Sequence, residues 1–191
     1  NGFYWRIARH REDPGLLEIR RAEDGLRAWA SEPGEYYNAF DGTYGGLWRR
    51  NGRAPQKLVG VGFTAQGTFK GMPYKRTCFD PEFDWVFEGI DSPILGDFGY
   101  SGNGAAGFEL DRVDPKLAPG INITVLAQSF AVDKNFILVP EEQLTHLTNL
   151  SGGPENEVKR ADMIYFEVPN GGRVFSVGSI TFCGSLPWNN F

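Results

Sequence analysis

Glycine is the residue that most constrains the fold of this chain, because 25 of its 191 residues are glycines. Glycine destabilises the interior of a helix, whereas it is the residue of choice in tight turns and left-handed backbone. Aromatic residues, which favour strands, make up a further 14% of the chain. The sequence therefore predicts short strands joined by turns rather than a helical bundle.

The expected strands lie between these turn signals. A first hairpin is predicted from residues 3–9 and 16–22, around Asp13-Pro14-Gly15. A second is predicted in "ADMIYFEVPNGGRVFSVGSITFCGSL", with its turn at Asn170-Gly171-Gly172. Further strands are expected at residues 57–67, 84–90, 105–111 and 122–130. The best helix pattern is residues 140–150, where Pro140 can occupy the first helical position.

Apolar runs such as "MIYF" and "VFSVG" suit strands that are buried on both faces of a sheet. We therefore expect an α/β fold, with a mixed sheet flanked by helices. The visible helix content is low for that architecture, so a β-rich sandwich is the alternative. No repeat or clear linker divides the sequence, and residues 1–191 are expected to form one domain.

Charge and composition exclude several kinds of partner. The net charge of −5 argues against a general nucleic-acid surface, in spite of the basic run at residues 49–53, which is expected to be a solvated turn. No apolar segment is long enough to span a membrane. The two cysteines, Cys78 and Cys183, are far apart and outside any C-x-x-C motif, which fits a reducing cytoplasm.

Several kinds of catalytic site are also excluded or weakened. With only His10 and His146, a three-histidine zinc site is impossible, and two cysteines exclude a cysteine-rich one. No G-x-S-x-G elbow is present for a serine hydrolase. Cys183 could act as a nucleophile if a histidine approached it, but a free cysteine in an apolar strand is more often part of the core.

The segment "GNGAAG" at residues 102–107 matches the pattern G-x-G-x-x-G. That pattern binds a dinucleotide only when a helix follows it, so that the phosphates meet the helix amino terminus. Here the next residues, "FELDRVD", indicate a strand. We predict that the segment binds no dinucleotide and that its small residues let two backbones approach closely.

Oxygen donors in glycine-rich surroundings remain as candidates, namely Tyr4, Tyr44 and Glu109. Glu109 lies between two apolar residues and would face away from them on a strand. A carboxylate is costly to bury unless something compensates its charge, and phenolate and carboxylate oxygens suit a hard, highly charged metal ion. Two alternatives are open: the tyrosines could be core residues, and Glu109 could pair with an arginine such as Arg112.

Nine segments, in order along the whole chain, together resemble one known family. They are "NGFYWR", "RRAEDGLRAW", "GEYY", "YGGLWRR", "LVGVGFTAQG", "VFEGI", "LGDFG", "GAAGFELDR" and "GSITFCGSLPWNN". The set is similar to the carboxy-terminal domain of the large (beta) subunit of N,N-dimethylformamidase. This resemblance implies a fragment of a longer large subunit and part of a domain that is similar to class I glutamine amidotransferases.

The resemblance also implies a mononuclear iron site, with Fe3+ held by two tyrosines and one glutamate. These correspond to Tyr4 in "NGFYW", Tyr44 in "TYGGLW" and Glu109 in "GFELD". Tyr36 and Tyr37 are close enough in the sequence to replace Tyr44 in this assignment.

The activity implied is iron-dependent hydrolysis of a small linear amide to a carboxylic acid and an amine. The iron would polarise the carbonyl and activate a water, while the general acid or base is unassigned. Gly107 departs from the polar residue expected near the metal in some members, which puts the substrate in doubt. The alternative is a catalytically inactive binding or assembly module of the same fold.

A cytoplasmic location is expected from the cysteine usage. A small partner subunit and a homo-oligomer are the partners to test for, and the sequence decides neither. Ordering Tyr4 close to the end of an isolated chain would cost backbone entropy. We therefore expect the isolated 191 residues to bind iron weakly and to lack amidase activity.

Overall fold

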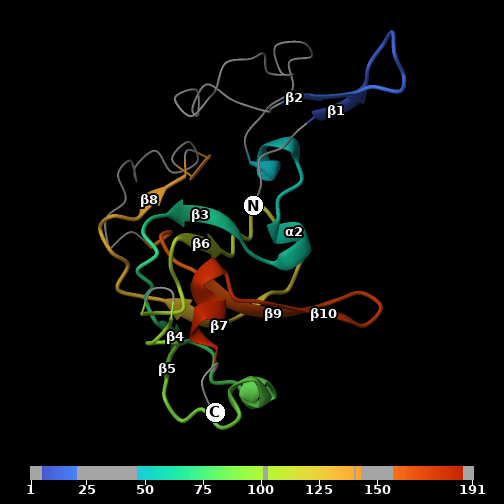
Figure 1. Ribbon diagram of the computed structural model, residues 1–191. Coiled ribbons are helices and arrows are strands. Elements are labelled where there is room, and N and C mark those ends of the chain that lie inside the picture. Colours follow the sequence, from blue (N-terminus) through green and yellow to red (C-terminus); the bar gives the residue numbers. More distant parts are fainter. Residues whose placement is uncertain (1–5, 21–46, 101–102, 140, 143–156, 187–191) are drawn as a thin grey trace. The chain divides into compact units, whose positions relative to one another are not determined.

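The computed structural model describes residues 6–20, 47–100, 103–139, 141–142 and 157–186 (Figure 1). The chain divides into two compact units, Asn1–Pro55 and Gln56–Phe191, which are described separately. In the described residues, no helix is both long enough and apolar enough to cross a membrane.

The first unit contains the predicted amino-terminal hairpin. Strands β1 (Arg6–Arg9) and β2 (Leu17–Arg20) pair antiparallel, with Arg9 opposite Leu17. The turn is closed by the Asp13 side chain, which accepts a hydrogen bond from the Gly15 amide at 3.0 Å. This Asx turn confirms the prediction, because an aspartate followed by proline and glycine specifies the turn locally.

The basic run of the first unit lies in a single turn of 3-10 helix, η2 (Trp48–Asn51). The helix ends at Gly52, whose φ of 72° is left-handed. The Arg53 guanidinium lies over the Trp48 ring, 5.8 Å from its centroid. Gly52 and Arg53 are exposed, as expected of a solvated turn, whereas Arg49 of the same run is half-buried.

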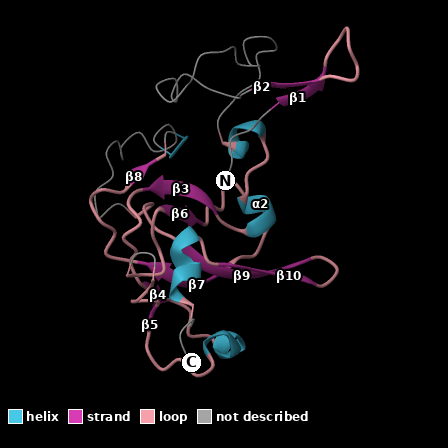
Figure 2. Ribbon diagram, viewed as in Figure 1, coloured by secondary structure: helices cyan, strands magenta, loops and turns pink. Residues whose placement is uncertain are grey.

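The second unit contains a five-stranded antiparallel sheet in the order β10-β9-β7-β4-β5 (Figure 2). Its strands are β4 (Tyr74–Arg76), β5 (Ile94–Leu95), β7 (Thr124–Ser129), β9 (Asp162–Val168) and β10 (Gly172–Ser176). The turn between β9 and β10 places Asn170 and Gly171 at φ values of 75° and 91°. Asparagine and glycine tolerate this left-handed backbone best, and the predicted second hairpin is confirmed.

A second, three-stranded sheet has the order β6-β3-β8 and is also antiparallel. It consists of β3 (Gly62–Gln66), β6 (Glu109–Arg112) and β8 (Ile137–Leu138). The strand expected at 57–67 begins later than predicted, because residues 56–59 form a short helix, α2 (Gln56–Val59). That helix ends at Gly60, whose φ of 79° is left-handed. The strand expected at 122–130 is confirmed by β7, and the one at 105–111 is confirmed in part by β6.

The strand predicted at residues 84–90 is wrong. Residues Pro81–Phe87 form a 3-10 helix, η3. Asp80 caps it by accepting a hydrogen bond from the Glu82 amide at 3.0 Å, and Pro81 occupies the first turn. An aspartate followed by proline is a helix-start signal, and it outweighs the strand propensity of the aromatic residues behind it.

Two further expectations concern helices. Glu141 and Glu142 have helical backbone, and the rest of the helix predicted at 140–150 lies outside the described residues. Cys183 was expected in an apolar strand, but it lies exposed in a 3-10 helix, η4 (Ile180–Ser185). The last strand, β10, therefore ends at Ser176, two residues before Gly178, which has left-handed backbone.

The expected sheet is present, but the described strands lack the parallel pairs that a mixed sheet or an amidotransferase-like domain would contribute. Parallel strands need a crossover of about a dozen residues or more, usually a helix. The helices that lie wholly within the described residues have four to seven residues, as in α2 and η3. The β-rich alternative therefore describes these residues better than a sheet flanked by helices.

One apolar core joins the two sheets of the second unit. It contains Leu110 and Leu138 from the smaller sheet and Leu126 and Met163 from the larger one. Tyr74 is fully buried in the same core, and its hydroxyl donates to the Val177 carbonyl at 2.5 Å. Burial raises the pKa of Tyr74 far above its usual range, so this phenol stays neutral.

The glycine-rich segment before β6 makes a close backbone contact. Met72 and Ala106 form an isolated bridge, with N–O distances of 2.7 and 2.9 Å in the two directions. A Cβ atom on Gly71 would lie 2.0 Å from the Gly104 carbonyl oxygen. The strand expected after this segment is confirmed, and so is the close approach; the absence of dinucleotide binding stays a prediction.

Gly71→Ala should destabilise the protein by about 3 kcal/mol, because the two backbones must separate to admit the methyl group. The matched control is Gly89→Ala. Gly89 has open space around it and needs only its left-handed φ of 76°, so that change should cost about 1 kcal/mol. Urea unfolding of the two variants measures the difference, and equal losses would contradict the close approach.

Candidate functional site

Glu109 is the predicted site residue that the structure describes. It is the first residue of β6 and lies opposite Gln66 on β3. Leu110 and Arg112 of the same strand are buried, whereas Glu109 and Asp111 are half-buried. The strand therefore turns Glu109 away from the apolar core, as its position between two apolar residues predicts.

The carboxylate of Glu109 makes no hydrogen bond or ion pair with any side chain that the structure describes. The expected alternative, a pair with Arg112, is not found: the Arg112 guanidinium pairs with Asp114 and Glu142. A half-buried carboxylate with no compensating group fits a cation, since desolvation of an uncompensated negative charge is unfavourable.

The other predicted ligands cannot be compared with Glu109. Tyr4 and Tyr44 lie outside the described residues, as do the alternatives Tyr36 and Tyr37. Across the described ranges, no group of three or more histidine, cysteine, aspartate or glutamate side chains could hold a metal ion. A metal site at Glu109 therefore needs ligands of another type or from another part of the chain.

The backbone immediately before Glu109 is strained. The Glu109 amide donates to the Gly107 carbonyl at 2.7 Å, which closes a three-residue γ-turn around Phe108. Phe108 has a φ of 60°. A bulky residue in this left-handed region is an outlier, and a γ-turn with positive φ at its centre is the rarer, strained form.

Gly107 has little room for a side chain. A Cβ atom there would lie 2.9 Å from the Gly71 Cα and 3.1 Å from both the Phe69 carbonyl oxygen and the Thr181 hydroxyl. This crowding gives a structural reason for the glycine at a position where the resemblance led us to expect a polar residue in some members.

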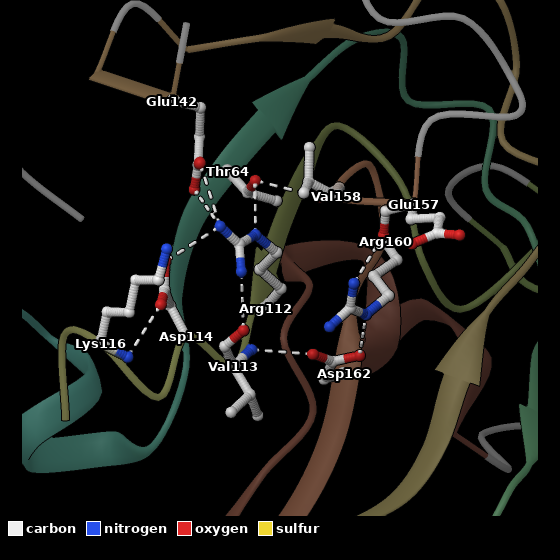
Figure 3. Close-up of polar contacts among 10 residues, drawn as sticks. All are labelled: Thr64, Arg112, Val113, Asp114, Lys116, Glu142, Glu157, Val158, Arg160 and Asp162. Carbon is white, nitrogen blue, oxygen red and sulfur yellow. Dashed lines mark hydrogen bonds and ion pairs between the residues drawn. The ribbon is translucent and has the colours of Figure 1, made fainter. Parts of the chain in front are cut away.

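A buried charge network lies at the other end of β6 (Figure 3). Arg112 Nη2 is 3.1 Å from Asp114 Oδ2 and 3.0 Å from Glu142 Oε2. Its Nε donates to the Thr64 hydroxyl at 3.3 Å, and its Nη1 donates to the Val113 carbonyl at 2.9 Å. The guanidinium thus connects β6 to β3 and to the helical residue Glu142.

Asp162 extends this network into the larger sheet (Figure 3). Its fully buried carboxylate accepts hydrogen bonds from the Val113 amide at 2.7 Å, from Gln128 Nε2 at 2.8 Å and from Arg160 Nε at 2.8 Å. Each buried charge is therefore compensated, in contrast to Glu109. The network therefore has a structural role, whereas Glu109 is a half-buried carboxylate without a partner among the described side chains.

Sequence reasoning missed a contact between a tyrosine and a glutamate on strand β9. The Tyr165 hydroxyl donates a hydrogen bond to Glu167 at 2.9 Å. The pKa of Tyr165 is raised, mainly by desolvation and to a lesser extent by this hydrogen bond. Both line a surface pocket of about 390 Å³, together with Cys78, Asp80, Glu82, Phe83, Asn122, Thr124 and Phe166. The "MIYF" run predicted only a buried strand, and the i, i+2 spacing of Tyr165 and Glu167 is the signal that could have found the pair.

The remaining candidates have structural roles or no described partner. His10 Nδ1 accepts hydrogen bonds from the amides of Glu12 and Asp13, at 3.3 and 3.2 Å, so this histidine belongs to its own turn. His146 lies outside the described residues. A nucleophilic role for Cys183 stays without support from a described histidine.

Comparison with known proteins settles the family. The family model for the N,N-dimethylformamidase beta subunit-like, C-terminal domain matches residues 1–191. The chain belongs to this family. It is 39% identical over 197 residues to the N,N-dimethylformamidase beta subunit of Paracoccus aminophilus, and 38% identical over 197 residues to that of an Alcaligenes species.

The two alignments with the family's curated members each cover 100% of this chain and 25% of the relative. The chain thus spans about a quarter of the length of these relatives. The resemblance found in the nine sequence segments is confirmed over the whole chain.

Arg112→Leu should destabilise the protein by about 3–5 kcal/mol, because it leaves two buried carboxylates without their cation. Urea unfolding of the variant and of the wild type, both at pH 7, measures this loss.

The matched control for this prediction is Arg173→Leu. Arg173 pairs with Glu167 at 3.2 Å, and the two side chains are 72% and 60% exposed. An exposed pair of this kind contributes less than about 1 kcal/mol. Similar losses in the two variants would contradict the structural role of the buried network.

Proposed function

We propose that the complete polypeptide carrying this chain is an iron-dependent hydrolase that converts a small linear amide to a carboxylic acid and an amine. The observation that carries the proposal is the match to the family over residues 1–191, at 39% identity to a relative named as an N,N-dimethylformamidase beta subunit. Because the relatives are named as subunits, a small partner subunit is part of the proposal.

The proposed ligands of a mononuclear Fe3+ are Tyr4, Tyr44 and Glu109. Of these, Glu109 has structural support, since its half-buried carboxylate has no partner among the described side chains. Carboxylate and phenolate oxygens match the preference of a hard ion. When bound, such an ion supplies Lewis-acid polarisation of the amide carbonyl and lowers the pKa of a water molecule.

The chain itself contributes charge and orientation at this site. Glu109 supplies one negative charge, and its backbone is fixed between the γ-turn on one side and the pairing with Gln66 of β3 on the other. A group held in this way loses little freedom when it binds, which favours a defined coordination direction. The residue that transfers the proton to the leaving amine is not assigned.

Glu109→Gln removes the charge of the carboxylate and keeps its shape. In the complete polypeptide it should lower the affinity for iron by at least about 100-fold, and amide hydrolysis should fall in parallel. Iron content after dialysis and amine release from N,N-dimethylformamide measure the two effects. The matched control is Asp91→Asn, which removes the same charge at an exposed position and should change neither.

The outcomes separate the proposed functions. Full iron content and a wild-type rate in Glu109→Gln would exclude Glu109 as a ligand. A wild-type polypeptide that holds no iron and hydrolyses no amide would instead support the inactive binding or assembly module.

The tyrosine ligands can be identified by colour, because tyrosinate bound to Fe3+ absorbs visible light through charge transfer. Tyr4→Phe and Tyr44→Phe should each weaken or shift this band in the complete polypeptide, since each removes one phenolate oxygen. Tyr36→Phe and Tyr37→Phe are the controls and should leave the band unchanged. A band lost only in Tyr36→Phe or Tyr37→Phe would move the second tyrosine ligand to that residue.

A further inference from the structure

The side chain of Ser179 is used in an unusual way. Ser179 is the N-cap residue of η4, a position where a serine hydroxyl normally accepts a hydrogen bond from the first turn of the helix. Here the hydroxyl makes no such bond. Instead, it contacts the backbone of Gly107, just before β6, and of Glu109, at the start of β6. These residues are 72 and 70 positions away from Ser179 in the sequence.

Three of these contacts surround the strained γ-turn. The Gly107 amide donates to Ser179 Oγ at 2.8 Å. Ser179 Oγ also lies 2.9 Å from the Gly107 carbonyl oxygen and 2.9 Å from the Glu109 carbonyl oxygen. A serine hydroxyl has one proton and two lone pairs, so it accepts from the amide and shares its proton between the two carbonyls. The hydroxyl therefore joins the two ends of the turn.

The opposite side of the turn is held by the segment after β3. The Phe108 amide donates to the Thr68 carbonyl at 2.8 Å, and the Gly67 amide donates to the Phe108 carbonyl at 2.8 Å. The Phe108 ring stacks on Phe69, with centroids 4.2 Å apart and the planes at 3°. A strained backbone persists only where its surroundings fix it from several sides, and such strain is concentrated at functional sites.

We propose that Ser179 is a positioning residue. Its hydroxyl holds the Gly107–Glu109 turn closed and so sets the direction of the Glu109 side chain at the start of β6. The inference rests on the proposed role of Glu109 as an iron ligand. Apart from the Thr181 hydroxyl at 3.4 Å, the Ser179 hydroxyl contacts backbone atoms, so it acts on the metal site through Glu109. Without the Ser179 hydroxyl, the contact that η4 keeps with the turn is the long one from the Thr181 hydroxyl to the Gly107 carbonyl oxygen, at 3.5 Å. The turn can then relax.

The first test uses the metal-free complete polypeptide. Ser179→Ala should speed hydrogen exchange at the Glu109 amide by about tenfold, as the loss of one or two hydrogen bonds of typical net strength implies. Ser179→Thr keeps the hydroxyl and should restore slow exchange. The matched control is Ser185→Ala, which removes another η4 hydroxyl that donates to a backbone carbonyl, that of Phe98. It should leave exchange at Glu109 unchanged.

The second test is iron affinity, measured by competition with a chelator. Ser179→Ala should weaken it by about 10- to 100-fold, the usual range for residues that orient a ligand. Ser179→Thr and Ser185→Ala should stay close to wild type. Wild-type exchange and affinity in Ser179→Ala would overturn the inference, and so would an equal loss of affinity in Ser185→Ala.

A double variant gives a signature that general destabilisation does not. Glycine adopts a positive φ without strain, so Phe108→Gly should make the turn independent of the hydroxyl. In that background, Ser179→Ala should weaken iron binding by less than about threefold, because the strain at residue 108 is gone. An undiminished effect would overturn the inference.

Glu109→Gln, measured alongside, separates this inference from the proposed function. Full iron binding in Glu109→Gln would overturn the ligand role and this inference with it. Loss of iron in Glu109→Gln, together with wild-type exchange and affinity in Ser179→Ala, would overturn this inference alone.

Discussion

The second unit depends on the hydrogen bonds and ion pairs of the buried Arg112 guanidinium. A buried cation is tolerated only where anions and other acceptors surround it, and Arg112 has Asp114, Glu142, Thr64 and the Val113 carbonyl within 3.3 Å. Through the Val113 amide, the same region is bonded to the fully buried Asp162 of β9. The alternative of leaving these groups unpaired is costly, so the position of β6 relative to β3 and β9 is strongly specified.

Strand β6 is thus held at both ends by different means. Charge compensation fixes Arg112, and a hydrogen-bonded, strained turn fixes Glu109 three residues earlier. Because side chains alternate along a strand, burial of Leu110 and Arg112 turns Glu109 out of the core. The proposed ligand is therefore presented by a short strand that has little freedom to shift.

Local signals in the sequence predicted the parts of the fold that local chemistry decides. Both hairpins follow from their turn residues, Asp13-Pro14-Gly15 and Asn170-Gly171. The orientation of the Glu109 side chain away from the core follows from its apolar neighbours. The error at residues 84–90 came from weighing aromatic strand propensity above the Asp80-Pro81 helix start. That signal was present in the sequence and could have been used.

Other features could not be predicted, because they depend on residues far apart in the chain. The Ser179 hydroxyl meets Glu109 across 70 residues, and Arg112 meets Glu142 across 30. Composition gives no sign of either contact, and the sheet order β10-β9-β7-β4-β5 is equally non-local. The chemistry of its side chain and the family resemblance both made Glu109 a candidate, whereas only the structure indicates what holds it in place.

The crowding around Gly107 has a consequence for how this site can diverge. Its neighbour across the contact is itself a glycine, Gly71, whose Cα would lie 2.9 Å from a new Cβ. A new side chain at residue 107 therefore collides with the main chain, and no substitution at residue 71 can remove main-chain atoms. A side chain at residue 107 can therefore be introduced only after other substitutions have shifted the segment that contains Gly71. Laboratory evolution aimed at this position should accordingly randomise the two segments together, because any single substitution there requires the neighbouring main chain to move.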